Sequence, residues 1–104
     1  MKKVAIIGAG IAGIASAIRL ADKGYAVEVF EANEYAGGKL SSFEQNGYRF
    51  DAGPSLFTLP HLVEELFQLV GKKASDFFEY ERLSTICHYF WEDRTRLNAY
   101  AEPS

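Results

Sequence analysis

The chain begins with two short apolar runs on either side of a longer stretch of helical character. Residues 4–7 are four apolar residues whose length and Val/Ile content are typical of a strand buried on both faces of a parallel sheet. Residues 11–23 form the longer stretch, Gly24 is suited to ending a helix, and residues 26–30 form the second apolar run. This order predicts a β-α-β unit with two parallel strands.

Two further patterns follow in the middle of the chain. Residues 40–44 and 48–51 flank Gln45-Asn46-Gly47, and Asn-Gly between such segments is a strong signal for a β-hairpin. Residues 60–70 are predicted to form a helix, with Pro60 in its first turn and Gly71 after its end. The apolar positions at helical spacing are Leu62, Val63, Leu66, Phe67 and Val70. We interpret this stripe as core rather than as a cofactor contact.

The last quarter of the chain is rich in aromatic residues. After a polar connection, residues 77–83, 86–92 and 95–99 are each predicted to form a strand. Their aromatic side chains could line a tunnel for a long apolar molecule, but we favour the packed face of an incomplete sheet. Cys87 is expected to be a small core residue, and His88 a structural one.

The turn after the first apolar run carries three glycines with the spacing G-x-G-x-x-G: Gly8, Gly10 and Gly13. The first allows a tight turn, the second lets the backbone approach a pyrophosphate, and the third lets the helix pack on the strand. The helix that follows directs free N–H groups and its positive end at the phosphates. Glu31 ends the second strand, where a carboxylate can bind ribose hydroxyls and would repel the 2′-phosphate of NADP. These residues predict a site for an adenine dinucleotide.

Further along, the chain resembles a known superfamily. Glu31-Ala32 is followed by Gly37-Gly38-Lys39, and Gly47 stands four residues before Asp51, which is followed by Gly53. This succession resembles the FAD motif of the flavin-containing amine oxidase and carotenoid desaturase superfamily. The resemblance spans essentially the whole chain and implies an FAD-binding oxidoreductase.

One branch of that superfamily fits the next residues best. Gly53-Pro54-Ser55, followed by Thr58-Leu59-Pro60, is similar to the phytoene desaturase and phytoene dehydrogenase-related branch, as is the segment 87–100. This resemblance implies hydride transfer from an apolar, polyene-type substrate to FAD. Relatives often place Asp-Gly where this chain has Asp93-Arg94, so the turn there is either strained or wider.

The resemblance also extends the predicted site. Gly37-Gly38 would let a loop pass close to the flavin's phosphate and ribitol, and Lys39 would add a positive charge near the pyrophosphate. The residues expected to bind the cofactor are Gly8, Ala9, Gly10, Ile11, Ala12, Gly13, Glu31, Ala32, Gly37, Gly38, Lys39, Gly53, Pro54 and Ser55. No residue is assigned a catalytic role, and no metal ligands are expected.

The length of 104 residues allows one domain or less. Family members run to several hundred residues, so the resemblance implies an amino-terminal fragment that is inactive alone. We expect residues 1–58 to form the FAD/NAD(P)-binding Rossmann-like portion and residues 59–104 the helix and strands of an incomplete substrate-side domain. Exposed apolar faces of such a piece favour a homo-oligomer.

Charge and cysteine content restrict the other function classes. The net charge of −3 offers no basic patch for nucleic acid. The single cysteine, Cys87, fits a reducing compartment, so we expect a cytoplasmic protein. No stretch approaches the 18 apolar residues of a membrane span, which leaves peripheral membrane contact open. Two alternatives also remain: a non-catalytic nucleotide-binding module, and an amine oxidase-type fragment.

Overall fold

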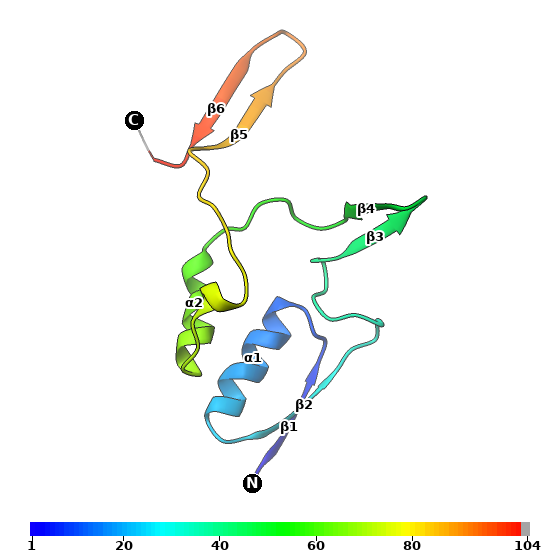
Figure 1. Ribbon diagram of the computed structural model, residues 1–104, viewed down its shortest axis with the longest axis vertical. Coiled ribbons are helices and arrows are strands. Elements are labelled where there is room, and N and C mark those ends of the chain that lie inside the picture. Colours follow the sequence, from blue (N-terminus) through cyan, green and yellow to red (C-terminus); the bar gives the residue numbers. More distant parts are fainter. Residues whose placement is uncertain (103–104) are drawn as a thin grey trace.

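The computed structural model describes residues 1–102. Its elements, in chain order, are β1 (Lys3–Ile7), α1 (Ile11–Asp22), β2 (Ala26–Phe30), β3 (Ser42–Gln45), β4 (Tyr48–Asp51), α2 (Pro60–Leu69), a 3-10 turn (Ala74–Asp76), β5 (Thr85–Phe90) and β6 (Arg96–Tyr100). The described strands form three separate two-stranded sheets, β1-β2, β3-β4 and β5-β6 (Figure 1). The predicted fold class, a parallel β-α-β unit followed by hairpins and a helix, is confirmed.

The first unit places α1 on one face of the parallel pair β1-β2. Val4 pairs with Val27 and Ile6 with Val29, and α1 contacts both strands. The expectation that β1 is buried on both faces is wrong, since Ile7 is 83% exposed. The reason is that, within the described part of the chain, β1 and β2 contact no helix or strand except each other and α1.

The predicted hairpin forms between β3 and β4. Asn46 and Gly47 both have positive φ, 52° and 82°, as the two central residues of a type I′ turn require. Gln45 pairs with Tyr48 across this turn, as the sequence indicates. The hairpin is reinforced by stacking of Phe43 on Phe50, with ring centroids 5.2 Å apart.

Helix α2 packs against α1 and against the 3-10 turn at Ala74–Asp76. Leu66 is the most buried residue of its apolar stripe, at 7% exposed, whereas Leu62 and Val70 remain 46% and 45% exposed. The expectation that the whole stripe lies in a core is therefore only partly correct. One side of α2 has no neighbouring layer among the described residues.

The prediction of a strand over 77–83 is wrong. In the structure this segment has no strand pairing, and its aromatic rings pack on α2 and on the loop before it. Phe78 contacts Phe57 and Phe67, with centroids 5.9 Å apart in each pair. Alternating side chains indicate which residues can be covered, but a strand also needs a partner for its backbone groups.

Strands β5 and β6 form an antiparallel hairpin that projects from one end of the molecule (Figure 1). Arg94 has φ 70°, and its N–H donates to the carbonyl of Trp91 at 3.0 Å. These features define a three-residue loop with Arg94 in the left-handed position that normally favours glycine. The turn is therefore both wider than the expected Asp93-Arg94 connection and strained at Arg94. The expectation for Cys87 is wrong, because it is only half-buried on this exposed hairpin.

The molecule is elongated, with extents of 61 × 40 × 25 Å and a radius of gyration of 18.3 Å. A compact chain of this length would have a radius of about 13 Å. Its accessible surface is 9056 Å², against roughly 5,800 Å² for a compact protein of this mass. The buried apolar residues of the described chain are Ala9, Leu66 and Ala74, and each keeps a small exposed fraction. The backbone is therefore folded locally, but most of its apolar side chains stay uncovered.

Candidate functional site

The glycine-rich turn connects β1 to α1. A Cβ atom at Gly13 would collide with the carbonyl oxygen of Gly8 and would lie 3.4 Å from a methyl carbon of Ile6. This geometry matches the role predicted for the third glycine, which is to let the helix pack directly on the end of the strand. The start of α1 is fixed against β1 in this way.

The N-terminus of α1 leaves backbone donors unused by the helix. Gly10 is its N-cap and provides no side-chain acceptor, and the first helical bond runs from the N–H of Ile14 to the carbonyl of Gly10, at 3.0 Å. The N–H groups of residues 10–13 therefore precede the helical ladder. Together with the positive end of the helix dipole, they form an arrangement suited to a phosphate.

Glu31 reaches back to the glycine-rich turn. Its Oε1 accepts a hydrogen bond from the N–H of Ala9 at 2.8 Å, and its Oε2 accepts one from the N–H of Asn33 at 2.9 Å. These bonds, first that from Asn33 and then that from Ala9, lower the pKa of Glu31 because they stabilise the charged form. The carboxylate is therefore ionised and held in one orientation.

The loop after β2 is in direct contact with the same turn. The N–H of Gly37 donates to the carbonyl of Ala9 at 2.7 Å. A Cβ atom at Gly38 would lie 3.1 Å from the Cα of Gly10, which is closer than side chains normally approach. The structure thus brings the two glycine segments together through backbone contact.

Gly53 contacts the end of this loop. A Cβ atom at Gly53 would collide with the carbonyl oxygen of Lys39, so the chain after β4 lies directly on the Gly37–Lys39 segment. Gly53 and Pro54 also line a hollow of 280 Å³ with Leu40, Ser41, Ser42, Arg49 and Asp51. The side chains of Ala32, Lys39, Pro54 and Ser55 are exposed.

The predicted cofactor residues that make contacts therefore form two groups, and the members of each group contact one another. The first is made by residues 8–13 with Glu31 and Gly37-Gly38, and the second by Lys39 with Gly53. The bonds of Glu31 to Ala9 and Asn33 were not predicted from the sequence. The sequence did contain a signal for the bond between Glu31 and Ala9, because the carboxyl ends of adjacent parallel strands lie at the same edge of a sheet.

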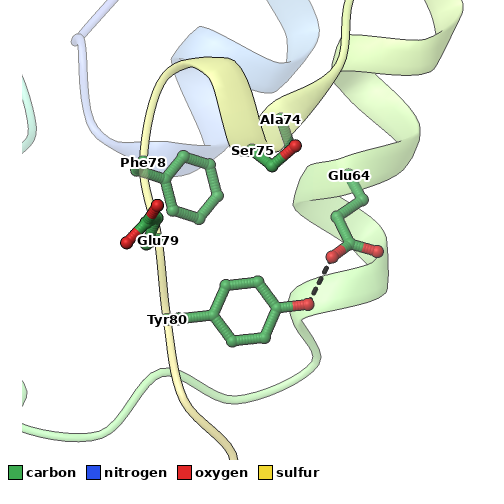
Figure 2. Close-up of a pocket in the computed structure, with 6 residues that line it drawn as sticks. All are labelled: Glu64, Ala74, Ser75, Phe78, Glu79 and Tyr80. Atoms are coloured by element: carbon green, nitrogen blue, oxygen red, sulfur yellow. Dashed lines mark hydrogen bonds between the residues drawn. The ribbon is translucent and has the colours of Figure 1, made fainter.

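A second hollow lies between α2 and the segment after the 3-10 turn (Figure 2). It has a volume of 260 Å³ and is lined by Glu64, Ala74, Ser75, Phe78, Glu79 and Tyr80. The Tyr80 hydroxyl donates a hydrogen bond to Glu64, and this bond raises the pKa of Tyr80 because ionisation would break it. The hollow contains none of the predicted cofactor residues, and the bond ties the segment to α2.

Comparison with known proteins decides the family. Residues 6–72 match the model of the family described as "NAD(P)-binding Rossmann-like domain". The chain belongs to this family. The matched residues include the glycine-rich turn, Glu31, the Gly37-Gly38 loop and all of α2. The contacts among these matched residues therefore lie within a Rossmann-like domain.

Two relatives of this Rossmann-like domain are named as a desaturase and an oxygenase. It is 61% identical to 1-hydroxycarotenoid 3,4-desaturase of Flavobacterium sp. (strain P99-3), over 98% of this chain and 21% of that protein. It is 39% identical to 4,4'-diaponeurosporene oxygenase of Staphylococcus aureus (strain USA300), over 95% of this chain and 20% of that protein. The resemblance to carotenoid desaturases is confirmed, and the chain spans about a fifth of the length of these relatives.

A solved structure shows the same fold. The crystal structure of an oxidoreductase from Methanosarcina mazei matches 64% of this chain and 17% of its own, with a TM-score of 0.50 and 33% identity.

Neither helix within residues 1–102 has the length and apolar character needed to cross a membrane.

Proposed function

We propose that this Rossmann-like domain binds the ADP half of FAD. The observation that carries the proposal is the meeting of the glycine-rich turn, Glu31 and the Gly37-Gly38 loop at one end of the β1-β2 sheet. The turn supplies unpaired helix donors for phosphate, and the carboxylate supplies acceptors for ribose hydroxyls. Both kinds of group are in place in a backbone that leaves no room for a side chain at Gly13 and little room for one at Gly38.

The residues have distinct roles in this proposal. The N–H groups of residues 10–13 hold the pyrophosphate, and Lys39 adds a positive charge on the adjoining loop. Glu31 accepts hydrogen bonds from the ribose and disfavours a 2′-phosphate. Pro54 and Ser55 continue the path from the contact between Gly53 and Lys39 toward the rest of the cofactor.

Two observations favour FAD over NAD. The first is the Gly37-Gly38 pair of the flavin motif, and the second is that relatives are named as a carotenoid desaturase and an oxygenase. When bound, the flavin would accept a hydride from a C–H bond of the substrate. We propose a polyene-type substrate for a longer protein of this kind. Residues 1–58 would serve the cofactor, residues 59–104 would begin the substrate side, and this chain alone would not turn over substrate.

Binding of ADP and FAD to the purified chain tests the proposal. We expect both to bind in isothermal titration calorimetry, and Glu31→Ala to weaken ADP binding about tenfold or more, the scale of a lost charged hydrogen bond. Glu34→Ala is the matched control, because Glu34 is an exposed carboxylate in the same loop. A folded wild-type chain that binds neither ligand would refute the proposal.

A second candidate is a nucleotide-binding module without catalysis. It is supported by the uncovered apolar faces beside the site, such as Ile7 and Phe30, which are 83% and 52% exposed. Such a chain would hold ADP and leave the isoalloxazine free in solvent. Such a module would bind ADP and FAD equally well and would leave the absorption spectrum of the flavin unchanged. A chain that also contacts FAD beyond its ADP half would shift this spectrum and bind FAD more tightly than ADP.

A further inference from the structure

The peptide groups of the glycine-rich turn are held by the last residue of β2 and by residues that follow it. The N–H of Gly8 donates to the carbonyl of Phe30 at 2.7 Å, and the N–H of Ala9 donates to Glu31 at 2.8 Å. The carbonyl of Ala9 accepts from the N–H of Gly37 at 2.7 Å. Ala9 is 6% exposed and is among the most buried residues of the molecule. The turn is therefore fastened at two consecutive residues by a separate segment of chain.

Among these three hydrogen bonds, only the one to Glu31 involves a side chain. The orientation of the Glu31 carboxylate is fixed by a second hydrogen bond, on its other oxygen. The N–H of Asn33 donates to Oε2 at 2.9 Å, while Ala9 donates to Oε1. The two donors come from segments far apart in sequence. A carboxylate bonded on both oxygens cannot rotate without breaking one of the bonds, so it couples the loop after β2 to the turn before α1.

These two bonds leave the carboxylate able to bind a ligand. An ionised carboxylate has about four acceptor sites, and Ala9 and Asn33 occupy one on each oxygen. Each oxygen thus keeps a lone pair for one hydroxyl of a ribose. Binding to the ribose and fastening of the turn are therefore compatible in the same side chain.

We infer that Glu31 is a positioning residue that orders the glycine-rich turn before any dinucleotide binds, and that the ribose then binds a carboxylate which keeps its bonds to Ala9 and Asn33. The part concerning the ribose rests on the proposed function. The benefit is preorganisation, because a turn already fixed in its binding form loses little conformational freedom when the phosphate arrives.

Amide NMR of the free chain tests the inference without a ligand. The backbone amide signals of Ala9 and Asn33 should shift together in one titration between pH 7 and pH 3, following the Glu31 carboxylate. In Glu31→Gln both titrations should vanish, and hydrogen exchange at Ala9 should become at least tenfold faster. Glu34→Gln, in the same loop, should leave both signals as in the wild type.

The titration of the wild-type chain needs no variant, so it tests the positioning role of Glu31 even if Glu31→Gln fails to fold. An Ala9 amide that exchanges freely, or that does not titrate with Asn33, would overturn the inference. Addition of ADP should leave the exchange at Ala9 slow, and faster exchange in the complex would refute the shared carboxylate. A chain that shows the coupled titration but binds no ADP would refute the proposed function and leave the positioning role standing.

Discussion

Gly13 lies so close to Gly8 that a Cβ atom on Gly13 would overlap the Gly8 carbonyl oxygen. This contact sets the distance between the first turn of α1 and the end of β1. The contact between Gly13 and Gly8 also fixes the direction of the N–H groups at the start of α1. A helix displaced from the strand would carry these N–H groups away from the turn. The position of the proposed phosphate site therefore depends on the absence of one methyl group.

Gly13→Ala should destabilise the chain by about 1 to 3 kcal/mol, the usual cost of overpacking. It should also weaken ADP binding, since the helix must shift to accept the methyl group. Urea unfolding followed by circular dichroism, together with calorimetric titration of ADP, measures both effects. Ser16→Ala, at an exposed position of the same helix, is the control. Equal stability of the two variants would contradict the contact.

Gly38→Ala should impair ADP binding more than Gly47→Ala. Both glycines have positive φ, 61° and 82°, so both variants carry the strain of a left-handed residue, about 1 kcal/mol. A Cβ at Gly38 also presses on the Cα of Gly10 at 3.1 Å, whereas a Cβ at Gly47 meets nothing within 4 Å. The comparison of ADP affinities isolates the contact between the two loops. A similar loss of affinity in both variants would show that only strain matters.

Much of this site could be predicted from the sequence, because its residues are fixed by local requirements. The strand, turn and helix around Gly13 follow from a short apolar run, glycine spacing and a helical stretch, and the type I′ turn follows from Asn46-Gly47. The contact of Gly38 with Gly10 was harder to foresee. The sequence indicated a close approach to a ligand, while the structure shows a close approach to the backbone of the first turn.

Acid should remove a stabilising contribution from Glu31. Its pKa in the folded chain is lowered from an ordinary value near 4.5 by the bonds from Asn33 and Ala9. The stabilisation is therefore complete above the ordinary pKa and is lost as the pH falls through the lower, folded value. Urea midpoints of the wild type should fall more steeply below about pH 4.5 than those of Glu31→Gln. Asp93, whose pKa is also lowered, is present in both chains and cancels in the comparison.

Arg94→Gly should stabilise the β5-β6 hairpin by about 1 kcal/mol. Arg94 occupies a left-handed position with φ 70°, which glycine adopts without strain. Thermal or urea unfolding of the two chains measures the difference. Arg94→Ala keeps the strain while removing the charge, so it should match the wild type within a few tenths of a kcal/mol. A gain in Arg94→Ala as large as that in Arg94→Gly would instead assign the effect to the charge.

The parts that the sequence did not predict depend on neighbours rather than on local pattern. Residues 77–83 are predicted to form a strand, yet Phe78 and Tyr80 pack on Phe57, and no strand within residues 1–102 pairs with this segment. Ile7 has the character of a core residue but is exposed, because one face of the β1-β2 sheet lacks a covering layer among the described residues. Periodicity shows which side chains can be buried, and tertiary contacts decide which of them are.

The separation of the strands into three independent pairs has a consequence for the order of folding. The β3-β4 and β5-β6 hairpins each close over a short loop, and such hairpins form within microseconds. The β1-β2 pair must bring together strands that α1 separates, which costs more loop-closure entropy before any contact is gained. The turn donates to Phe30 and Glu31 and accepts from Gly37, and these bonds require that pairing. We therefore expect the proposed nucleotide site to be among the last features of this chain to assemble.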